Sequence, residues 1–167
     1  MGKKYPLEQL AFIKAKKLEE AERILREKKE KLIEEEKKLK AVEEERDKVK
    51  RHKLDKLEQL RGALDEGERT DKLEQMRIYL KLVEEKLKQH EKKVQDQEKE
   101  VEKAEEEVEL ARKQMLKRQR DVEKLKEHKK EWKKEMKYEM EKEEDTQADE
   151  IGGARFISEK RKKKRKQ

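Results

Sequence analysis

The feature that most constrains this chain is an apolar stripe that repeats every three or four residues from Leu73 to Met136. Its positions are Leu73, Met76, Leu80, Val83, Leu87, His90, Val94, Gln97, Val101, Ala104, Val108, Ala111, Met115, Arg118, Val122, Leu125, Lys129, Trp132 and Met136. Of these positions, only His90, Gln97, Arg118 and Lys129 are polar. An unbroken 3.5-residue period is typical of a long helix that packs along its length against another helix.

The composition excludes an ordinary globular core. Charged residues make up 57% of the 167-residue chain and apolar residues 30%, which suits a narrow helix–helix interface better than a three-dimensional interior. One proline and five glycines leave little to interrupt helices. The net charge of +7 comes from the run 160–166, because acidic and basic residues balance over 1–159. A balanced helical surface does not suit the wrapping of nucleic acid, so we expect no specific nucleic-acid binding along the helices.

The first part of the chain carries a second stripe. It consists of Leu18, Leu25, Leu32 and Leu39, interleaved with Ala21, Lys28, Glu35, Val42 and Val49. Lys53 then occupies a position where an apolar residue is due, and Leu54 and Leu57 continue the pattern one residue later. This change of phase predicts a local unwinding of the coiled coil near Lys50–Leu54.

Glycines at Gly62 and Gly67 mark a turn between the two stripes. Two striped helices joined by a short turn should form an all-α, antiparallel two-helix coiled-coil hairpin, and one chain suffices to build it, so we expect a monomer. We expect the hairpin over about 1–145, with a first arm at about 6–62, a turn at about 63–70 and a second arm at about 71–145. Thr70 or Asp71 should cap the second arm. Gly152 and Gly153 predict an end to helix, which leaves 146–167 as a flexible basic tail.

The hairpin fixes which residues face each other. Positions on the two arms whose numbers sum to about 136 should lie side by side. This arrangement brings Tyr5 and Leu7 to the neighbourhood of Lys129 and Trp132.

No catalytic or metal-binding pattern is present in the sequence. There is no cysteine, and His52, His90 and His128 are far apart, without other ligands at metal spacing. The carboxylates lie on helix faces expected to be solvated, where paired acid–base chemistry has no dry pocket. No glycine-rich phosphate loop, secretory signal or apolar run long enough to insert into a membrane occurs. We expect a protein that is not an enzyme and has no cofactor.

Two pairs of bulky apolar residues lie off the stripes, Phe12 with Ile13 and Ile78 with Tyr79. Each pair could contact a partner or could be ordinary scattered exposure. The polar stripe positions could fix the register, or their aliphatic stems could cross the interface while the charges reach water. The basic tail is compatible with nucleic acid, an acidic surface or simple solubilisation.

Several segments resemble the YscO family, the stalk proteins of type III secretion systems, which are similar in role to the flagellar export protein FliJ. They are Tyr5-Pro-Leu-Glu-Gln9, Asp55-Lys-Leu-Glu-Gln-Leu-Arg61, Leu64-Asp-Glu-Gly67, Arg77-Ile-Tyr-Leu-Lys-Leu-Val-Glu-Glu-Lys-Leu87 and His128-Lys-Lys-Glu-Trp-Lys-Lys-Glu135. The resemblance implies a long antiparallel hairpin that links the hexameric secretion ATPase to the export gate and contacts substrate chaperones. It also implies a cytoplasmic protein, peripheral to the inner-membrane secretion apparatus.

By the same analogy, the free ends of the hairpin would face the ATPase and the turn would face the gate. The candidate partner-binding residues are Leu7, Phe12, Ile13 and Trp132 at the free ends, and Arg77, Ile78 and Tyr79 near the turn. Two other functions remain open at this point. One is a scaffold coiled coil that dimerises as a parallel rod, and the other is a nucleic-acid-associated protein that acts through its basic tail.

Overall fold

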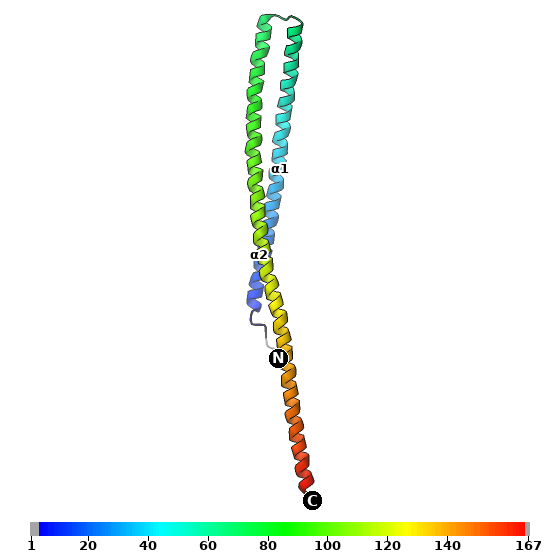
Figure 1. Cartoon of the computed structure of the whole chain (residues 1–167). Helices are drawn as coiled ribbons and strands as arrows, with labels where there is room; N and C mark the ends of the chain where they lie inside the picture. Colours follow the sequence, from blue (N-terminus) through cyan, green and yellow to red (C-terminus); the bar gives the residue numbers. More distant parts are fainter. Residues whose placement is uncertain (1–3, 166–167) are drawn as a thin grey trace. The chain divides into compact units, whose positions relative to one another are not determined.

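The computed structural model describes residues 4–165 and contains two helices within them. Helix α1 spans Glu8–Asp65 and helix α2 spans Thr70–Arg165. In Figure 1, the cyan part of α1 and the green part of α2 lie side by side and run in opposite directions on either side of the turn. The predicted all-α hairpin is therefore confirmed.

The turn reverses the chain through a Schellman motif at the end of α1. Gly67 has a positive φ of 70°, a backbone conformation that costs glycine little. Its amide donates to the carbonyl of Leu64 at 3.2 Å, and the amide of Glu68 donates to Ala63 at 3.0 Å. The first arm therefore ends at Asp65, a few residues after Gly62, because Gly67 is the residue that takes the left-handed conformation.

Helix α2 begins one residue earlier than predicted. The amide of Leu73 donates to the carbonyl of Arg69 at 3.0 Å, which makes Arg69 the N-cap. The predicted cap at Thr70 or Asp71 is wrong, since the Asp71 carboxylate instead accepts a hydrogen bond from the Arg69 guanidinium at 3.2 Å.

The chain divides into two compact units. The first, here called the turn unit, is Glu20–Met115, and the second, the terminal unit, combines the chain up to Glu19 with the chain from Leu116. The buried side chains of the turn unit are Leu25 of α1 and Val83, Leu87, Val94, Ala104 and Ala111 of α2. Among the described residues of the terminal unit, Tyr5 and Val122 are buried.

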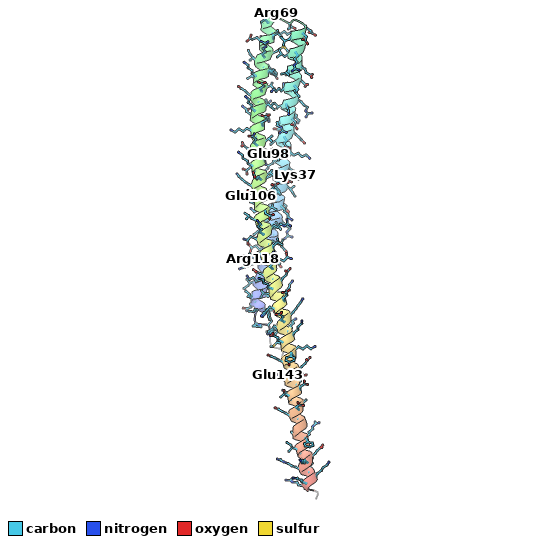
Figure 2. The ribbon with its side chains drawn as sticks, in the orientation of Figure 1. Lys37, Arg69, Glu98, Glu106, Arg118 and Glu143 are labelled. Atoms are coloured by element: carbon cyan, nitrogen blue, oxygen red, sulfur yellow. The ribbon has the colours of Figure 1, made fainter. Side chains whose placement is uncertain are left out.

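The stripe on α2 follows the predicted positions. Every one of them from Leu73 to Met136 is buried or half-buried, while nearly all the residues between them are exposed. Long polar side chains such as Lys37, Glu98 and Glu143 project outward from the ribbon in Figure 2. The strict 3.5-residue period was thus sufficient to identify the packed face of this helix.

The stripe on α1 departs from the prediction after Val49. Lys53 and Lys56 are half-buried, whereas Leu54 is 55% exposed. The packed face therefore keeps its phase, and the predicted shift near Lys50–Leu54 is wrong. Lysine can occupy such a position because its stem covers apolar surface while its ammonium reaches a partner, here Glu84 at 3.3 Å from Lys53.

Polar contacts between the helices establish the register in each unit. In the turn unit, Lys28 pairs with Glu107 at 2.8 Å and the Gln97 amide donates to the Glu35 carboxylate at 2.6 Å. In the terminal unit, Lys14 pairs with Asp121 at 3.2 Å. These pairs follow the predicted antiparallel register to within a few residues.

The end of α2 differs most from the sequence prediction. The helix continues beyond Glu144 to Arg165, and every residue from 137 to 165 is exposed. The predicted flexible tail at 146–167 is thus helical over 146–165, and residues 166–167 lie outside the described part. Gly152 and Gly153 each cost about 1 kcal/mol in a helix, which is too little to end one when strong helix formers follow and no proline intervenes. Lys162, Lys163, Lys164 and Arg165 also suit the negative end of the helix dipole.

Candidate partner-binding surfaces

Tyr5 anchors the start of the chain on α2 in the terminal unit. Its ring is buried and packs edge-on against Trp132, with 5.4 Å between ring centroids. Its hydroxyl is hydrogen bonded to Nδ1 of His128 at 2.7 Å, and the Lys129 ammonium lies 5.6 Å from its ring centroid. The predicted proximity of Tyr5 to Lys129 and Trp132 is confirmed, and the cluster holds the first turn of α1 in place.

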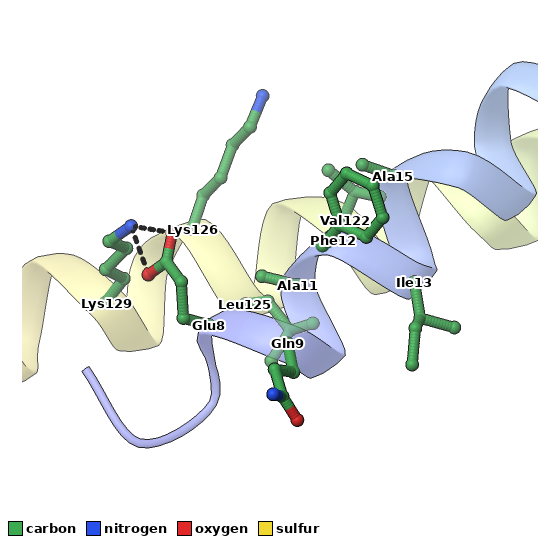
Figure 3. Close-up of a pocket in the computed structure, with 10 residues that line it drawn as sticks. All are labelled: Glu8, Gln9, Ala11, Phe12, Ile13, Ala15, Val122, Leu125, Lys126 and Lys129. Atoms are coloured by element: carbon green, nitrogen blue, oxygen red, sulfur yellow. Dashed lines mark hydrogen bonds and ion pairs between the residues drawn. The ribbon is translucent and has the colours of Figure 1, made fainter. Parts of the chain in front are cut away.

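An open groove of about 760 Å³ lies next to this cluster, between the first turns of α1 and the facing part of α2. It is lined by Glu8, Gln9, Ala11, Phe12, Ile13, Ala15, Val122, Leu125, Lys126 and Lys129. Figure 3 shows these residues on the two helices, with the Lys129 ammonium bonded to both carboxylate oxygens of Glu8 at 2.8 and 2.6 Å. The groove is therefore apolar along most of its wall and has a fixed ion pair at one edge.

The structure separates the four residues predicted at the free ends. Phe12 and Ile13 line the groove and are 64% and 49% exposed. Leu7 and Trp132 are half-buried, and the ring of Trp132 packs on Tyr5. Phe12 and Ile13 therefore offer free apolar surface to a partner, whereas Trp132 contributes chiefly to packing within the chain.

The residues predicted near the turn are exposed on α2 of the turn unit. Arg77 is exposed, Ile78 is 55% exposed, and Tyr79 is also exposed. The Tyr79 hydroxyl is hydrogen bonded to Nε2 of His52 at 3.0 Å, and the Lys56 ammonium lies 5.5 Å from its ring centroid. Tyr79 is consequently held against α1. Ile78 is the residue of the pair that offers more exposed apolar surface to a partner.

Hydrogen bonds from lysine and glutamine side chains, most of them across the helix interface, lower the pKa of several carboxylates. A hydrogen bond from Lys28, and to a smaller extent one from Lys31, holds the pKa of Glu107 below its ordinary value. The bond from Lys14 lowers the pKa of Asp121 in the same way. Hydrogen bonds from Lys38 and Gln97 lower the pKa of Glu35. These carboxylates are bound to lysine or glutamine partners, which suits a structural role in the interface.

His90 is a stripe residue, as predicted. It is half-buried, and its Nδ1 atom is buried without a hydrogen-bond partner among the described residues. Across residues 4–165, no group of three or more His, Asp or Glu side chains is arranged to hold a metal ion. Neither helix, over the same residues, has an apolar stretch suited to crossing a membrane.

Comparison with known proteins identifies the family. The family model of YscO-like proteins matches residues 2–162. This chain belongs to the YscO-like family. The solved structure of a proposed YscO homolog from Chlamydia trachomatis, CT670, is 38% identical to it and superposes with a TM-score of 0.91, covering 95% of this chain and 98% of that one. No curated protein matches the chain.

Membership of the YscO-like family supports a stalk-type component of type III secretion, a structural part of the secretion machinery. The antiparallel pairing of α1 and α2 is consistent with that class. Sequence reasoning missed the groove, because Val122 and Leu125 were read only as stripe positions. Their antiparallel pairing with the Phe12 segment was the available signal, since the predicted register already placed them opposite it.

Proposed function

We propose that this YscO-like chain is the stalk that couples the hexameric secretion ATPase to the export gate, with substrate chaperones as further partners. It acts in the cytoplasm, peripheral to the inner-membrane apparatus, without catalysis of its own. The observation that carries the proposal is the pair of exposed apolar residues in each unit, Phe12 with Ile13 and Ile78 with Tyr79. A narrow two-helix interface leaves these residues uncovered, and a partner protein can cover them.

The groove in the terminal unit supports contact with the ATPase. Phe12 and Ile13 line it together with Val122 and Leu125, so an apolar side chain of the partner can enter it. Trp132 supports the groove through its packing on Tyr5, and the half-buried Leu7 just before α1 is assigned to the same contact. Gate contact is assigned to Ile78 and Arg77 in the turn unit, with Tyr79 held against α1 beside them.

Capture of the cognate secretion ATPase by the full chain tests the first contact, together with ATP hydrolysis rates measured with and without the chain. We expect Phe12→Ala with Ile13→Ala to weaken capture by about tenfold or more, as for the loss of contacts worth at least 1.4 kcal/mol. Ile33→Ala is the control, because Ile33 lies in the turn unit and is as exposed as Ile13, at 49%. Unchanged capture by the double variant would refute the assignment.

Secretion by cells that carry Ile78→Ala with Tyr79→Ala tests the second contact. We expect export to fall while capture of the ATPase persists, because the changes lie in the other unit. Leu110→Ala, which alters an exposed leucine elsewhere on α2, should leave export intact. Normal export by a double variant with parental helicity would exclude the gate assignment.

A further inference from the structure

The exposed end of α2, residues 137–165, has an unusual distribution of charge; we call it the overhang. An acidic block precedes a basic block. The acidic residues are Glu141, Glu143, Glu144, Asp145, Asp149 and Glu150, and the basic residues are Arg155, Lys160, Arg161, Lys162, Lys163, Lys164 and Arg165. Lys142 and Glu159 are the exceptions within these blocks. A helix of this kind is complementary to a copy of itself that runs in the opposite direction.

The centre of the overhang is apolar and uncharged. Ile151, Gly152, Gly153 and Ala154 separate the two blocks. A Cβ atom added at either glycine would meet nothing within 4 Å, so the fold of one chain gives no packing reason for two adjacent glycines in a helix. Successive residues are about 100° apart around a helix, so Gly152 and Gly153 lie on the side away from Ile151 and Ala154 and make no contact in a pair that forms through those two residues.

One face of the overhang is symmetric about the Gly152–Gly153 bond. Stepping alternately by four and three residues selects Met140, Glu144, Gln147, Ile151, Ala154, Ser158, Arg161 and Arg165. In an antiparallel pair centred on that bond, residues equally far from it face each other. Glu144 then meets Arg161, and Ile151 meets Ala154. The flanking positions agree, since Glu143 meets Lys162.

We propose that two copies of the chain pair through their overhangs as an antiparallel, two-fold symmetric helix dimer centred on Gly152–Gly153. Symmetry makes each contact occur twice. A second copy fits better than a phosphate-rich or acidic partner, because the acidic block lies on the same helix as the basic one and repels such partners. The inference goes beyond the proposed function and leaves each copy's own hairpin unchanged.

The absence of cysteine from the sequence allows a direct test in the full chain. Under mild oxidation, Ile151→Cys and Ala154→Cys should cross-link when mixed, because these two positions face each other across the symmetry axis. Glu144→Cys and Arg161→Cys should each give little cross-linking alone and should cross-link when mixed. Glu98→Cys, an exposed position in the turn unit, gives the background level. Self-linkage of Glu144→Cys would indicate a parallel pair, and background linkage throughout would show no pair; either result overturns the proposal.

A charge exchange provides an independent measurement by sedimentation equilibrium. Glu143→Lys with Glu144→Lys, and separately Arg161→Glu with Lys162→Glu, should each weaken self-association by about tenfold or more, and an equimolar mixture should restore it. Raising the salt concentration from low to high should weaken the parental dimer as well. The pairing would be refuted if the parent had the mass of a single chain at low salt, or if all the charge variants remained dimers. Binding to acidic vesicles without self-association would also refute it.

Discussion

At the scale of single residues, Tyr5 has a larger structural role than its position beside a chain terminus implies. Its ring packs on Trp132 and its hydroxyl is bonded to His128, so a residue outside α1 holds the beginning of that helix against α2. Trp132 is the only tryptophan in the chain, which makes its fluorescence a reporter of this contact.

Tyr5→Ala should expose Trp132 and release the first turns of α1. We expect a red-shifted tryptophan emission and a cost of about 3–5 kcal/mol to the local packing, the range for truncation of a buried aromatic residue. Tyr5→Phe keeps the ring and should cost only about 1 kcal/mol, for the lost hydrogen bond. Equal emission spectra for Tyr5→Ala and the parent would show that the ring does not shield Trp132.

Glu107 should make stability depend on pH. Because its lysine partners lower the pKa of Glu107 in the folded state, the bridge stabilises the fold above the unfolded pKa, about 4.3, and that contribution is lost as the pH falls through the lower folded value. Glu107→Gln should therefore lower the melting temperature at pH 7, and the difference from the parent should shrink as the pH falls below about 4. Thermal melts followed by circular dichroism measure this. The exposed neighbour variant Glu106→Gln serves as control, and a difference that persists undiminished in acid would contradict the argument.

At the scale of elements, the two glycines near the turn differ in conformation and position. Gly67 has a φ of 70°, whereas Gly62 lies within α1, and an added Cβ there would meet nothing within 4 Å.

Gly67→Ala should destabilise the hairpin by about 1 kcal/mol, since alanine resists the left-handed conformation. Gly62→Ala should stabilise it by up to about 1 kcal/mol, because alanine favours helix. Urea unfolding of the two variants measures both effects. Equal changes of the same sign would show that the turn conformation does not control stability.

The two helices were not equally predictable from sequence. The stripe of α2 is apolar at nearly every position, so its period alone identified the packed face from Leu73 to Met136. On α1 the exposed Leu54 suggested a change of phase, because a sequence pattern cannot show that Lys53 covers the interface with its stem and pairs with Glu84. Gly152 and Gly153 predicted the end of a helix, because the pattern shows the free-energy cost of glycine but not the stabilisation from the helix formers around it. The groove required the pairing of both helices before it could be recognised.

At the scale of the whole molecule, the buried side chains of each unit lie where α1 packs against α2. Nearly all the buried residues belong to the stripes, and Tyr5 is the buried residue that lies outside them among the described residues. Protection of the backbone should therefore follow the pairing of the helices.

Hydrogen exchange should be fastest in α2 beyond Met136 and slowest in the turn unit between Val83 and Ala111, where the buried stripe residues lie. Mass spectrometry of peptic fragments at low protein concentration measures this, a condition that also limits self-association. Similar protection of residues 137–165 and of the turn unit would contradict the view that packing against the other helix stabilises these backbones.

The interhelical ion pairs also have a mechanical consequence. If the helices slid past each other by one heptad, Lys53 would leave Glu84 and face either Arg77 or Glu91. Slipping one way would oppose Lys53 to Arg77, and slipping the other way would separate Lys14 from Asp121. A shift of one heptad in either direction therefore loses an interhelical ion pair, and these pairs favour the observed register. When a force pulls the two helices along their length, we expect them to separate before they slide past each other by one heptad.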